Sequence, residues 1–532
     1  MTDATRQERW WSGAVVYQLY VRSFRDSDGD GYGDLPGVIE KLDYLSWLGV
    51  DGVWLSPTMA SPDHDWGYDV SDYMSVHPEL GTLADLDRLV DEAGHLGMRV
   101  LLDLVPNHTS DEHPWFVEAR RSSDAAHRSW YVWADPRPDG SPPNNWLDAS
   151  GDSAWTLDEA TGQYYLHNFL PSQPDLNWWE PAVHDAFEEI IRFWFDRGVA
   201  GFRIDVAHGL YKDALLRDNP PMAPGQLVGG SAGQEHRYSA NRPETHAVFR
   251  SWRDIAERYE PTKVLLGETA VPDAVRLASY YGQDDELQLG FNFPFMVSGF
   301  TAPELSEVVG ETLRELPTGA VPAWTMSNHD TSRFTTRWCS GNDAKTALAL
   351  TVLLTLPGTI VVYYGDEIGM TDVEVPLELQ RDDMFLGGRG GHPSRDRSRT
   401  PMQWEPSPRG GFTAADATAW LPLGDVLSHN VADQREDPSS LLCLCRRLIA
   451  VRRLHIKGGD GTYAQLPSTD QHWVYRIGDV VVAANFSEEP GELRGQPGRL
   501  LISSVGLRHD GEPVGESLQL AGLEAVVVQP RR

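Results

Sequence analysis

Acidic residues and histidines follow one short apolar segment after another along this sequence. In chain order they are Asp103 with Asn107-His108, Asp205, Glu268, His329-Asp330 and Asp366-Glu367. Carboxylates gathered at one buried edge repel each other, so stability alone does not favour them. Cleavage of an uncharged substrate would explain them, because glycoside hydrolysis needs one carboxylate to attack or activate water and one carboxylic acid to protonate the leaving oxygen.

Two other roles compete with this chemistry. Any one of these side chains could cap a following helix or bond a loop, and we favour this role for Asp366-Glu367. Metal binding is the second alternative, but the sequence has no HExxH motif and no histidine pair at helical spacing. His329 and Asp330 are neighbours whose side chains would diverge on a strand. For the set as a whole, acid–base work on a substrate is the better interpretation.

A helix–strand unit that recurs along the chain must position these residues. In residues 83–96 apolar side chains share one helical face, Gly97 ends the helix, and the apolar strand MRVLLDL follows. Similar units end in VDGVWLSP, VAGFRIDV, TKVLLGE and TIVVYYGDE, and VVYQLYVRSF, GFNFPFM and AWTMSNHD bring the strand candidates to eight. Strands that are apolar throughout indicate a parallel sheet covered on both faces. We therefore predict an α/β protein with a (β/α)8 TIM barrel, rather than an open sheet with a glycine-rich nucleotide loop.

Composition changes along the chain predict further domains. The barrel is expected in residues 1–105 and 179–460, interrupted by a loop-rich inserted domain at 106–178 that is rich in Trp, Pro, Asp and Ser. A second loop-like stretch is expected at about 371–435. Residues 461–532 contain short alternating strands and are predicted to form a C-terminal all-β sandwich.

Four motifs at the predicted strand ends resemble the α-amylase family, glycoside hydrolase family 13. They are DLVPNH (103–108), GFRIDVAH (201–208), the Glu of LLGETA (265–270) and SNHD (327–330). The resemblance covers almost the whole chain and agrees with the predicted barrel, insertion and C-terminal domain. QPDLNW (173–178) and RTPMQW (399–404) look like the oligo-1,6-glucosidase and α-glucosidase branch.

The resemblance implies a role for each matching residue. Asp205 would be the nucleophile, Glu268 the acid/base, and Asp330 the third carboxylate, in a reaction that retains the anomeric configuration. Asp65 and Arg399 would pair to close the pocket around a terminal glucose, which implies exo action and some transglucosylation. The implied substrate-binding residues are Asp65, Tyr68, His108, Phe169, Arg203, Val206, His208, His329 and Arg399.

The linkage and the reaction type stay open at this point. Val206 resembles members that accept α-1,6 linkages, whereas the arrangement through His208 resembles actinobacterial-type maltose-acting α-glucosidases, so α-1,4 is slightly preferred. The alternatives are a related transferase or isomerase of the trehalose synthase or sucrose isomerase type, an endo-amylase with an open cleft, and a non-catalytic scaffold. A scaffold should lose its catalytic carboxylates and carry a membrane span.

An acidic loop near the N-terminus predicts a structural metal. In DSDGDGYGD, the residues Asp26, Asp28, Asp30, Tyr32 and Asp34 match five ligand positions of a calcium loop. The bidentate glutamate expected at the twelfth position is missing, so this is not an EF-hand. The related glucosidases carry a similar loop, which implies structural Ca²⁺, or Mg²⁺, and no cofactor for catalysis. A solvated acidic turn is the alternative.

Bulk composition limits the partners. With 78 acidic against 45 basic residues, the net charge of −33 disfavours nucleic acid and anionic lipid, leaving a small oligosaccharide or α-glucoside as the expected partner. The start, MTDATRQERWW, has no apolar stretch of signal-peptide length, and the three cysteines cannot form a disulfide framework. The uncharged run 346–364 is split by Pro357-Gly358, so a buried helix–turn–strand unit is expected. These features predict a cytoplasmic protein and leave its oligomeric state open.

Overall fold

The centre of the protein is an eight-stranded parallel sheet, in the order β11-β10-β7-β3-β2-β1-β13-β12. A parallel bridge between Phe291 and Ala323 joins the two ends of this order, so the sheet closes into a barrel. The computed structural model describes residues 9–223, 230–231, 233–456, 462–506, 508 and 510–531. The barrel strands are β1 (Val15–Leu19), β2 (Gly52–Leu55), β3 (Arg99–Leu104), β7 (Gly201–Ile204), β10 (Val264–Gly267), β11 (Leu289–Gly290), β12 (Ala323–Trp324) and β13 (Thr359–Tyr363).

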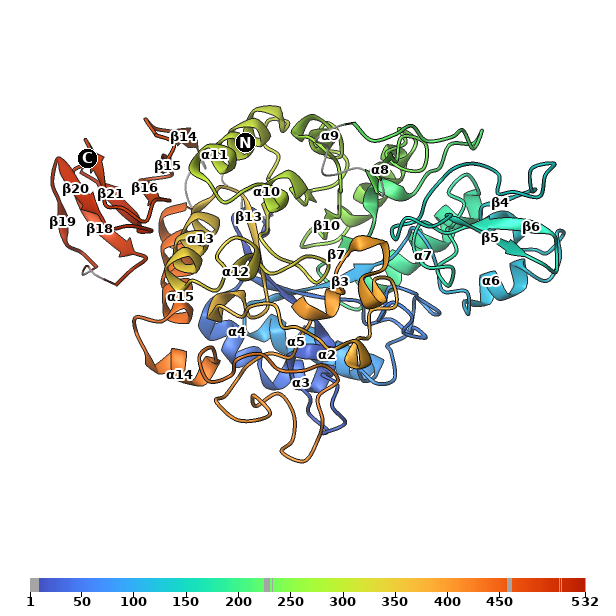
Figure 1. Ribbon diagram of the computed structural model, residues 1–532, viewed down its shortest axis with the longest axis horizontal. Helices are drawn as coiled ribbons and strands as arrows, with labels where there is room; N and C mark the ends of the chain where they lie inside the picture. The colour runs from blue at the N-terminus through green and yellow to red at the C-terminus, as the bar shows by residue number, and fades with distance from the viewer. Residues whose placement is uncertain are drawn as a thin grey trace.

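Helices surround the barrel and bury its outer face, as Figure 1 shows. They include α3 (Leu35–Glu40), α4 (Leu42–Leu48), α5 (Leu83–His95), α7 (Pro181–Asp196), α8 (Thr245–Ala256), α9 (Ala274–Ser279), α11 (Ala302–Glu315), α13 (Asp343–Thr355) and α15 (Leu441–Val451). Thr82 caps the start of helix α5 and forms a reciprocal capping box with Asp85. Gly97 follows the end of the helix with a φ of 78°. The (β/α)8 prediction and the helix predicted at 83–96 are therefore confirmed.

Three strand predictions were too long. In AWTMSNHD only Ala323 and Trp324 form strand β12. In VVYQLYVRSF the strand ends at Leu19, and Val21–Phe24 form the short helix α2. In GFNFPFM only Gly290 belongs to β11, and Phe293–Val297 form helix α10. Pro294 lies in the first turn of that helix and the Asn292 side chain caps it, so local chemistry favours a helix start over a strand.

The uncharged run near residue 350 is a helix–turn–strand unit, as expected. Helix α13 ends at Thr355 and β13 begins at Thr359, and every residue from Thr346 to Thr355 is buried inside the protein. Among the described residues, no helix has both the length and the apolar character needed to cross a membrane. The first eight residues, which contribute to the cytoplasmic prediction, and the predicted boundary at 460/461 lie outside the described residues.

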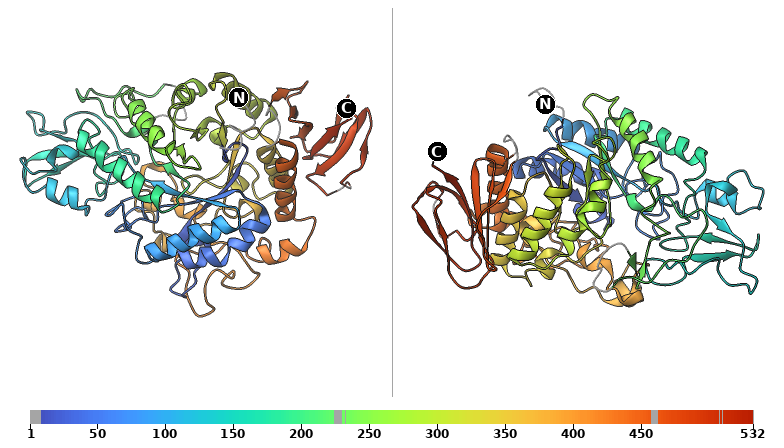
Figure 2. Two further views of the ribbon diagram at one scale, coloured as in Figure 1. Left: turned by 180° about the vertical axis from the view of Figure 1, so that it is seen from behind. Right: turned by 90° about the horizontal axis from the view of Figure 1, so that it is seen from above.

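Two smaller parts lie at opposite ends of the molecule in both views of Figure 2. The segment after β3 carries helix α6 (Pro114–Ala119) and a three-stranded sheet of β4 (Trp133–Ala134), β6 (Gln163–Leu166) and β5 (Trp155–Asp158). The C-terminal part has a six-stranded sheet in the order β14-β15-β16-β21-β18-β19, with β17 (Gly491–Arg494) pairing β20 (Ser517–Leu520). The strands of the six-stranded sheet are β14 (Tyr463–Gln465), β15 (His472–Ile477), β16 (Val480–Asn485), β18 (Gly498–Ser503), β19 (Pro513–Val514) and β21 (Ala525–Pro530). Leu493 of β17 and Leu520 of β20 share one apolar cluster with Val481 of β16, so the two sheets enclose a common core.

The loop-like stretch after β13 contains only short helices. They are η3 (Asp366–Ile368), η4 (Leu377–Leu379), η5 (Leu386–Gly391), η6 (Arg395–Ser398) and α14 (Val431–Glu436). This stretch leaves the barrel at the C-terminal end of β13 and therefore runs over the edge where parallel barrels carry their chemistry.

Candidate active site

The three carboxylates predicted to be catalytic lie together at the C-terminal edge of the barrel. Asp205 follows β7 directly, Glu268 follows β10 directly, and Asp330 lies in the loop between β12 and α12 (Phe334–Arg337). All three line one cavity of about 550 Å³. They meet because the strands of a parallel barrel all end on the same rim.

Arg203 of β7 connects two of these carboxylates from below. Its Nη1 donates to Oδ1 of Asp205 at 2.7 Å and to Oδ1 of Asp103 at 2.9 Å. Its Nη2 lies 2.9 Å from Oε2 of Glu268. The guanidinium is 1% exposed and does not line the cavity. Arg203 therefore contacts Asp205 and Glu268 from behind the cavity wall.

Burial opposes ionisation of the carboxylates around Arg203. It raises the pKa of Asp205 well above its usual range, and Glu268 and Asp103 add to this while Arg203 opposes it. Burial also raises the pKa of Asp103 to about 6, again against Arg203. The ionised form of Asp205 consequently depends on the short charge-assisted bond from Arg203.

Asp330 lies among positive and polar groups that favour its charge. Oδ1 accepts from Arg395 Nη1 and from Arg399 Nη2, each at 3.1 Å, and Oδ2 lies 3.0 Å from Nε2 of His329. Burial opposes the charge, but His329 and the two arginines outweigh it and lower the pKa of Asp330. The Gln18 amide donates to Nδ1 of His329 at 2.8 Å, so the neutral ring carries its proton on Nε2, facing Asp330.

The predicted Asp65–Arg399 pair is wrong. Asp65 Oδ1 pairs with Nη2 of Arg395 at 2.6 Å, and the two side chains are 5% and 9% exposed. Arg399 lies behind the cavity wall, fully buried, and its Nε donates to the His329 carbonyl at 2.8 Å. Both arginines lie in the loop after β13, where they flank the short helix η6 (Arg395–Ser398), and both donate to Oδ1 of Asp330.

Sequence reasoning missed Arg395 and the group that holds it. Asp382, which is fully buried, accepts from Nη2 of Arg395 at 2.7 Å and from its backbone N–H at 2.7 Å. On the other side, the Gln173 amide donates to Oδ2 of Asp65 at 3.1 Å. Arg395 lies only four residues before the RTPMQW motif, but no local pattern in the sequence shows which arginine reaches Asp65.

Aromatic and histidine side chains form the wall near Asp65. The Tyr68 hydroxyl donates to Asp103 at 2.9 Å, and its ring stacks on His329 at 5.1 Å between centroids. Nε2 of His108 lies 2.9 Å from the Tyr68 carbonyl, and the Phe169 ring is 5.2 Å from that of His108. Tyr68, His108 and Phe169 all line the cavity.

The residue after Asp205 has an unusual backbone conformation. Val206 adopts the left-handed region with a φ of 43°, which is a genuine outlier for a β-branched side chain. Its N–H donates to Oε2 of Glu268 at 2.8 Å. His208, also on the cavity wall, has Nδ1 3.2 Å from the Glu268 carbonyl, and burial lowers its pKa. The turn after β7 thus connects the loop that carries Asp205 to Glu268, and such strain is typical of functional sites.

The acidic loop at 26–34 brings three of its carboxylates together. Oxygen atoms of Asp26, Asp28 and Asp34 lie within 4.8 Å of one another, and Asp30 and Tyr32 are outside this trio. Asp26 is buried and already accepts from the N–H of Gly29 and Gly31. Burial and Asp28 raise the pKa of Asp34, as expected where carboxylates converge. The donor set of oxygen atoms suits a hard cation.

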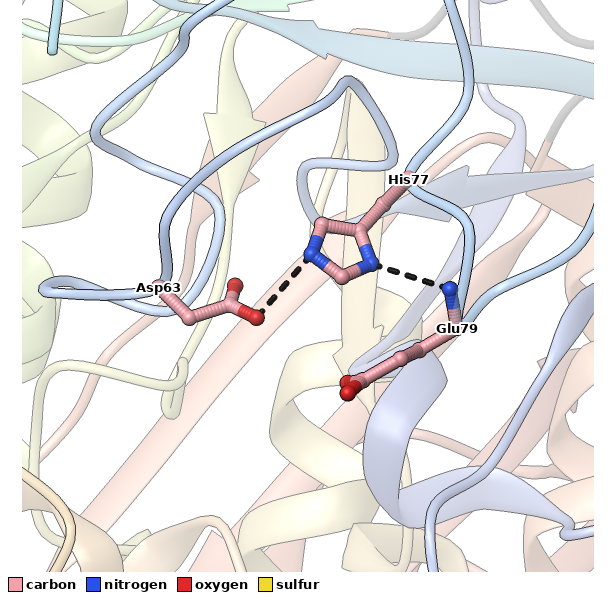
Figure 3. A group of neighbouring side chains, drawn as sticks. All are labelled: Asp63, His77 and Glu79. Carbon is pink, nitrogen blue, oxygen red and sulfur yellow. Dashed lines mark hydrogen bonds and ion pairs between the residues drawn. The ribbon is translucent and has the colours of Figure 1, made fainter. Parts of the chain in front are cut away.

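A second group with possible metal ligands has a different explanation. Figure 3 shows His77 between the Asp63 carboxylate, at 3.0 Å, and the N–H of Glu79, at 3.2 Å. The guanidinium of Arg22 pairs with Asp63 at 2.7 Å and with Glu79 at 2.8 Å, and its side chain is 4% exposed. Arg22 already supplies the positive charge that these carboxylates need, so the group is an ion-pair cluster.

Comparison with known families agrees with this geometry. The family model described as "Alpha amylase, catalytic domain" matches residues 18–458, which include the end of β1, the other seven barrel strands and the three carboxylates. The chain belongs to the α-amylase family. A probable α-glucosidase of Rhizobium meliloti is 42% identical over 460 residues, covering 84% of this chain and 82% of the relative. An oligo-1,6-glucosidase of Heyndrickxia coagulans is 39% identical over 526 residues, covering 90% and 92%.

Solved structures of other α-amylase-type enzymes superpose over nearly the whole chain. An α-glucosyl transfer enzyme has a TM-score of 0.91 at 38% identity, covering 98% of this chain and 99% of that one. A trehalulose synthase from Pseudomonas mesoacidophila has a TM-score of 0.87 at 30% identity, with the same coverage. This α-amylase-family chain is therefore similar to glucosidases, to an α-glucosyl transfer enzyme and to a trehalulose synthase.

Proposed function

We propose that this chain is a retaining α-glucosidase that releases one glucose at a time from the non-reducing end of short α-glucosides. The observation that carries the proposal is the meeting of Asp205, Glu268 and Asp330 in one cavity whose wall includes the Asp65–Arg395 ion pair. The α-glucosidase and oligo-1,6-glucosidase relatives support the same class of substrate.

In the first step, Asp205 attacks the anomeric carbon and Glu268 protonates the departing glycosidic oxygen. Arg203 holds Oδ1 of Asp205, which leaves Oδ2 as the attacking atom. A bond forms between Oδ2 and the anomeric carbon while the bond to the leaving oxygen breaks. Oε2 of Glu268 is held by the Val206 N–H and Arg203, so Oε1 is the oxygen proposed to carry the transferred proton.

In the second step, water attacks the anomeric carbon and gives its proton to Glu268, and the ester to Asp205 breaks. Two inversions return the α anomer. One guanidinium contacts both carboxylates, and this agrees with the short separation of about 5–5.5 Å typical of retaining enzymes. Asp330, kept ionised by its arginines, would bond sugar hydroxyls and stabilise positive charge on the ring during both steps.

The Asp65–Arg395 pair supports exo action. Asp65 comes from the loop after β2 and Arg395 from the loop after β13, so the pair joins two loops across the cavity wall. A cavity of about 550 Å³ is of the size that encloses a small ligand, about 300–1,000 Å³, rather than a polymer chain. We therefore propose maltose and short malto-oligosaccharides as substrates, with α-1,6 linkages as the second choice.

A substrate panel with the Asp205→Asn variant tests the proposal. The protein would be incubated with maltose, isomaltose, sucrose, trehalose and soluble starch, and NMR would follow the products and the first anomer released. We expect α-glucose from maltose, and a loss of about 10⁴-fold or more in Asp205→Asn with an unchanged melting temperature. β-Glucose as the first product, starch cleavage without free glucose, or full activity of the variant would contradict the proposal.

A transferase or isomerase is the second candidate, supported by the similarity to an α-glucosyl transfer enzyme and a trehalulose synthase. It would use the same Asp205 ester, with a sugar in place of water as the attacking hydroxyl. In the same panel, conversion of sucrose or maltose to an isomer with little free glucose would favour this candidate over hydrolysis.

We propose that Asp26, Asp28 and Asp34 hold a structural Ca²⁺, or Mg²⁺, with Asp30 and the Tyr32 carbonyl completing the site. A bound divalent ion would neutralise the converging carboxylates and tie the loop to the N-terminus of α3, which Asp34 caps. The proposed catalytic steps use only side chains of this chain and do not involve this ion. A cytoplasmic location stays a prediction.

A further inference from the structure

A buried lysine behind the cavity wall connects three segments that build the site. Lys212 lies in the loop after β7, is 3% exposed, and is not among the described residues that line the cavity. Its Nζ donates to Oδ1 of Asn107 at 2.6 Å and to the Gly209 carbonyl at 2.5 Å, and lies 2.8 Å from Oδ2 of Asp175. Burial lowers the pKa of Lys212, and Asp175 opposes this. The three oxygen atoms match the three N–H groups of an ammonium, so Lys212 is held in its charged form.

The bond from Lys212 fixes which way the Asn107 amide faces. An ammonium only donates, so the atom that faces Lys212 must be the amide oxygen. The amide nitrogen Nδ2 then faces Nδ1 of His108 at 3.1 Å and Oδ1 of Asp175 at 3.3 Å. Because Nδ2 donates, Nδ1 of His108 must accept, and the proton of the neutral ring lies on Nε2. Nε2 is 2.9 Å from the Tyr68 carbonyl, which accepts this N–H.

The same bond opposes protonation of His108. An imidazolium carries a second N–H at Nδ1 and needs an acceptor there. Asn107 offers its oxygen to this position only when the amide turns over, and this would direct Nδ2 at Lys212 and Oδ1 at the Asp175 carboxylate. Burial is the largest cause of the lowered pKa of His108, and Lys212 lowers it further. Asp175 and Asp65 act in the opposite direction. Lys212 therefore offsets the charge of Asp175 and keeps the ring neutral.

Another bond from Lys212 supports the turn after β7. Gly209, whose carbonyl accepts from Lys212, donates its N–H to the Val206 carbonyl at 2.8 Å and ends the short helix η2 (Ala207–Gly209). Val206 is the residue in the left-handed region whose N–H donates to Glu268. A strained turn of this kind persists only where the surrounding contacts hold it. Lys212 supplies such a contact and connects the turn to the end of β3 and to the segment inserted after it.

A neutral His108 suits the proposed reaction. His108 lines the cavity, and the transition state of glycoside cleavage carries positive charge on the sugar ring. An imidazolium in the wall would repel this charge, whereas a neutral ring does not. We propose that Lys212 is a positioning residue that keeps His108 neutral, with its proton on Nε2, and fixes the turn at Val206. The expected effect on catalysis rests on the proposed α-glucosidase function, but the protonation of His108 can be measured without a substrate.

The kinetic test starts with Lys212→Met, which removes the ammonium and leaves Asp175 to act on His108 without a counter-charge. A nearby charge changes a pKa by about 1–3 pH units, so His108 should hold a proton up to higher pH in this variant. We therefore expect the acidic limb of kcat on maltose to move up by about one pH unit or more, and kcat at about pH 6 to fall at least tenfold. KM should change less than about threefold, because the sugar-binding groups of the cavity stay in place.

Two further variants separate charge balance from a general structural effect. Lys212→Met/Asp175→Asn removes both charges and should return the acidic limb to within about 0.5 pH unit of the wild type. Lys263→Met is the matched control, because Lys263 is also buried and also donates to a backbone carbonyl, but directly before β10, at the opposite end of the barrel from the site. It should keep the wild-type profile. A Lys212→Met limb within about 0.3 pH unit of the wild type, or an equal shift in the double variant or in the control, overturns the inference.

A direct measurement on the wild-type protein does not depend on catalysis or on the stability of any Lys212 variant. With ¹⁵N-labelled histidine, the His108 signals are identified by their loss in His108→Gln and followed by NMR. We expect a neutral ring with its proton on Nε2 down to about pH 5.5, whereas an Nδ1–H ring, or an imidazolium at about pH 6.5, overturns the inference. Glucose release with an Nδ1–H ring refutes the role of Lys212 and leaves the α-glucosidase function standing. An Nε2–H ring in a protein that releases no glucose from any α-glucoside refutes the function and supports the positioning of His108.

Discussion

The pair between Asp65 and Arg395 predicts a strong energetic coupling that Asp65 and Arg399 should lack. The Asp65–Arg395 contact is 2.6 Å long and both side chains are more than nine-tenths buried. Close charge pairs of this kind couple by about 1.5–7 kcal/mol, and directly contacting residues generally by about 0.5–3 kcal/mol. For Asp65 and Arg395 we expect a coupling energy of about 2–3 kcal/mol in transition-state binding, which corresponds to about 30- to 150-fold in kcat/KM.

The assay is a pair of double-mutant cycles read as kcat/KM on a chromogenic α-glucoside. One cycle combines Asp65→Asn with Arg395→Gln, and the other combines Asp65→Asn with Arg399→Gln. In the first cycle the double variant should be little worse than the poorer single variant, because each change already breaks the pair. In the second cycle the coupling should stay below about 1 kcal/mol, since Arg399 is connected to Asp65 through Asp330 and Arg395 rather than by a direct contact.

Stability measurements complete that test. Arg395→Gln leaves the buried Asp382 without its partner, so this variant should also lose thermal stability, whereas Asp65→Asn should lose less. Because a coupling energy compares four proteins, a shared loss of stability cancels. A coupling for Asp65–Arg399 equal to or larger than that for Asp65–Arg395 would refute the reasoning.

Three further predictions concern stability, the metal and the role of Arg203. Burial raises the pKa of Asp366 to about 7, whereas an unfolded aspartate has a pKa near 3.9, so between these values only the folded state keeps the proton. The stability that this proton contributes should be lost as pH rises from about 4 to 7. In Asp366→Asn the melting temperature should therefore depend less on pH over that range. Chelation should lower the melting temperature by a few degrees and Ca²⁺ should restore it, but Asp26→Asn should show no response to either treatment. Arg203→Met should reduce kcat/KM by at least about 10³-fold and shift the acidic limb of the pH profile to higher pH. The reason is that the Asp205 carboxylate loses the cation that opposes the rise in its pKa caused by burial. A pH profile that does not shift would contradict this role.

Much of the fold could be predicted from the sequence because the information is local. Apolar periodicity over 83–96, the stop at Gly97 and the strand that follows are decided by side chains close together in the chain, and the structure agrees. The same holds for α13, the turn at Pro357-Gly358 and β13. At Phe293–Val297 the apolar sequence suggested a strand, but Pro294 and the Asn292 cap favour the start of a helix, and a helix forms there.

The candidate carboxylates could also be predicted, for a topological reason. Asp205 and Glu268 each follow a strand, and every strand of a parallel barrel ends on the same rim, so position along the chain implies proximity in space. For Asp330 the motif in the loop after β12 supplied the same information.

Only the tertiary structure decided which partners these residues have. Arg395 and Arg399 are four residues apart in one loop, and both touch Asp330, yet only Arg395 pairs with Asp65, more than 300 positions away in the chain. Nothing in the local sequence distinguishes two arginines of the same charge and size; the turn at Arg395–Ser398 and the buried Asp382 do so by their positions. Residue types and strand order determine what chemistry is available, and long-range packing decides which atoms carry it out.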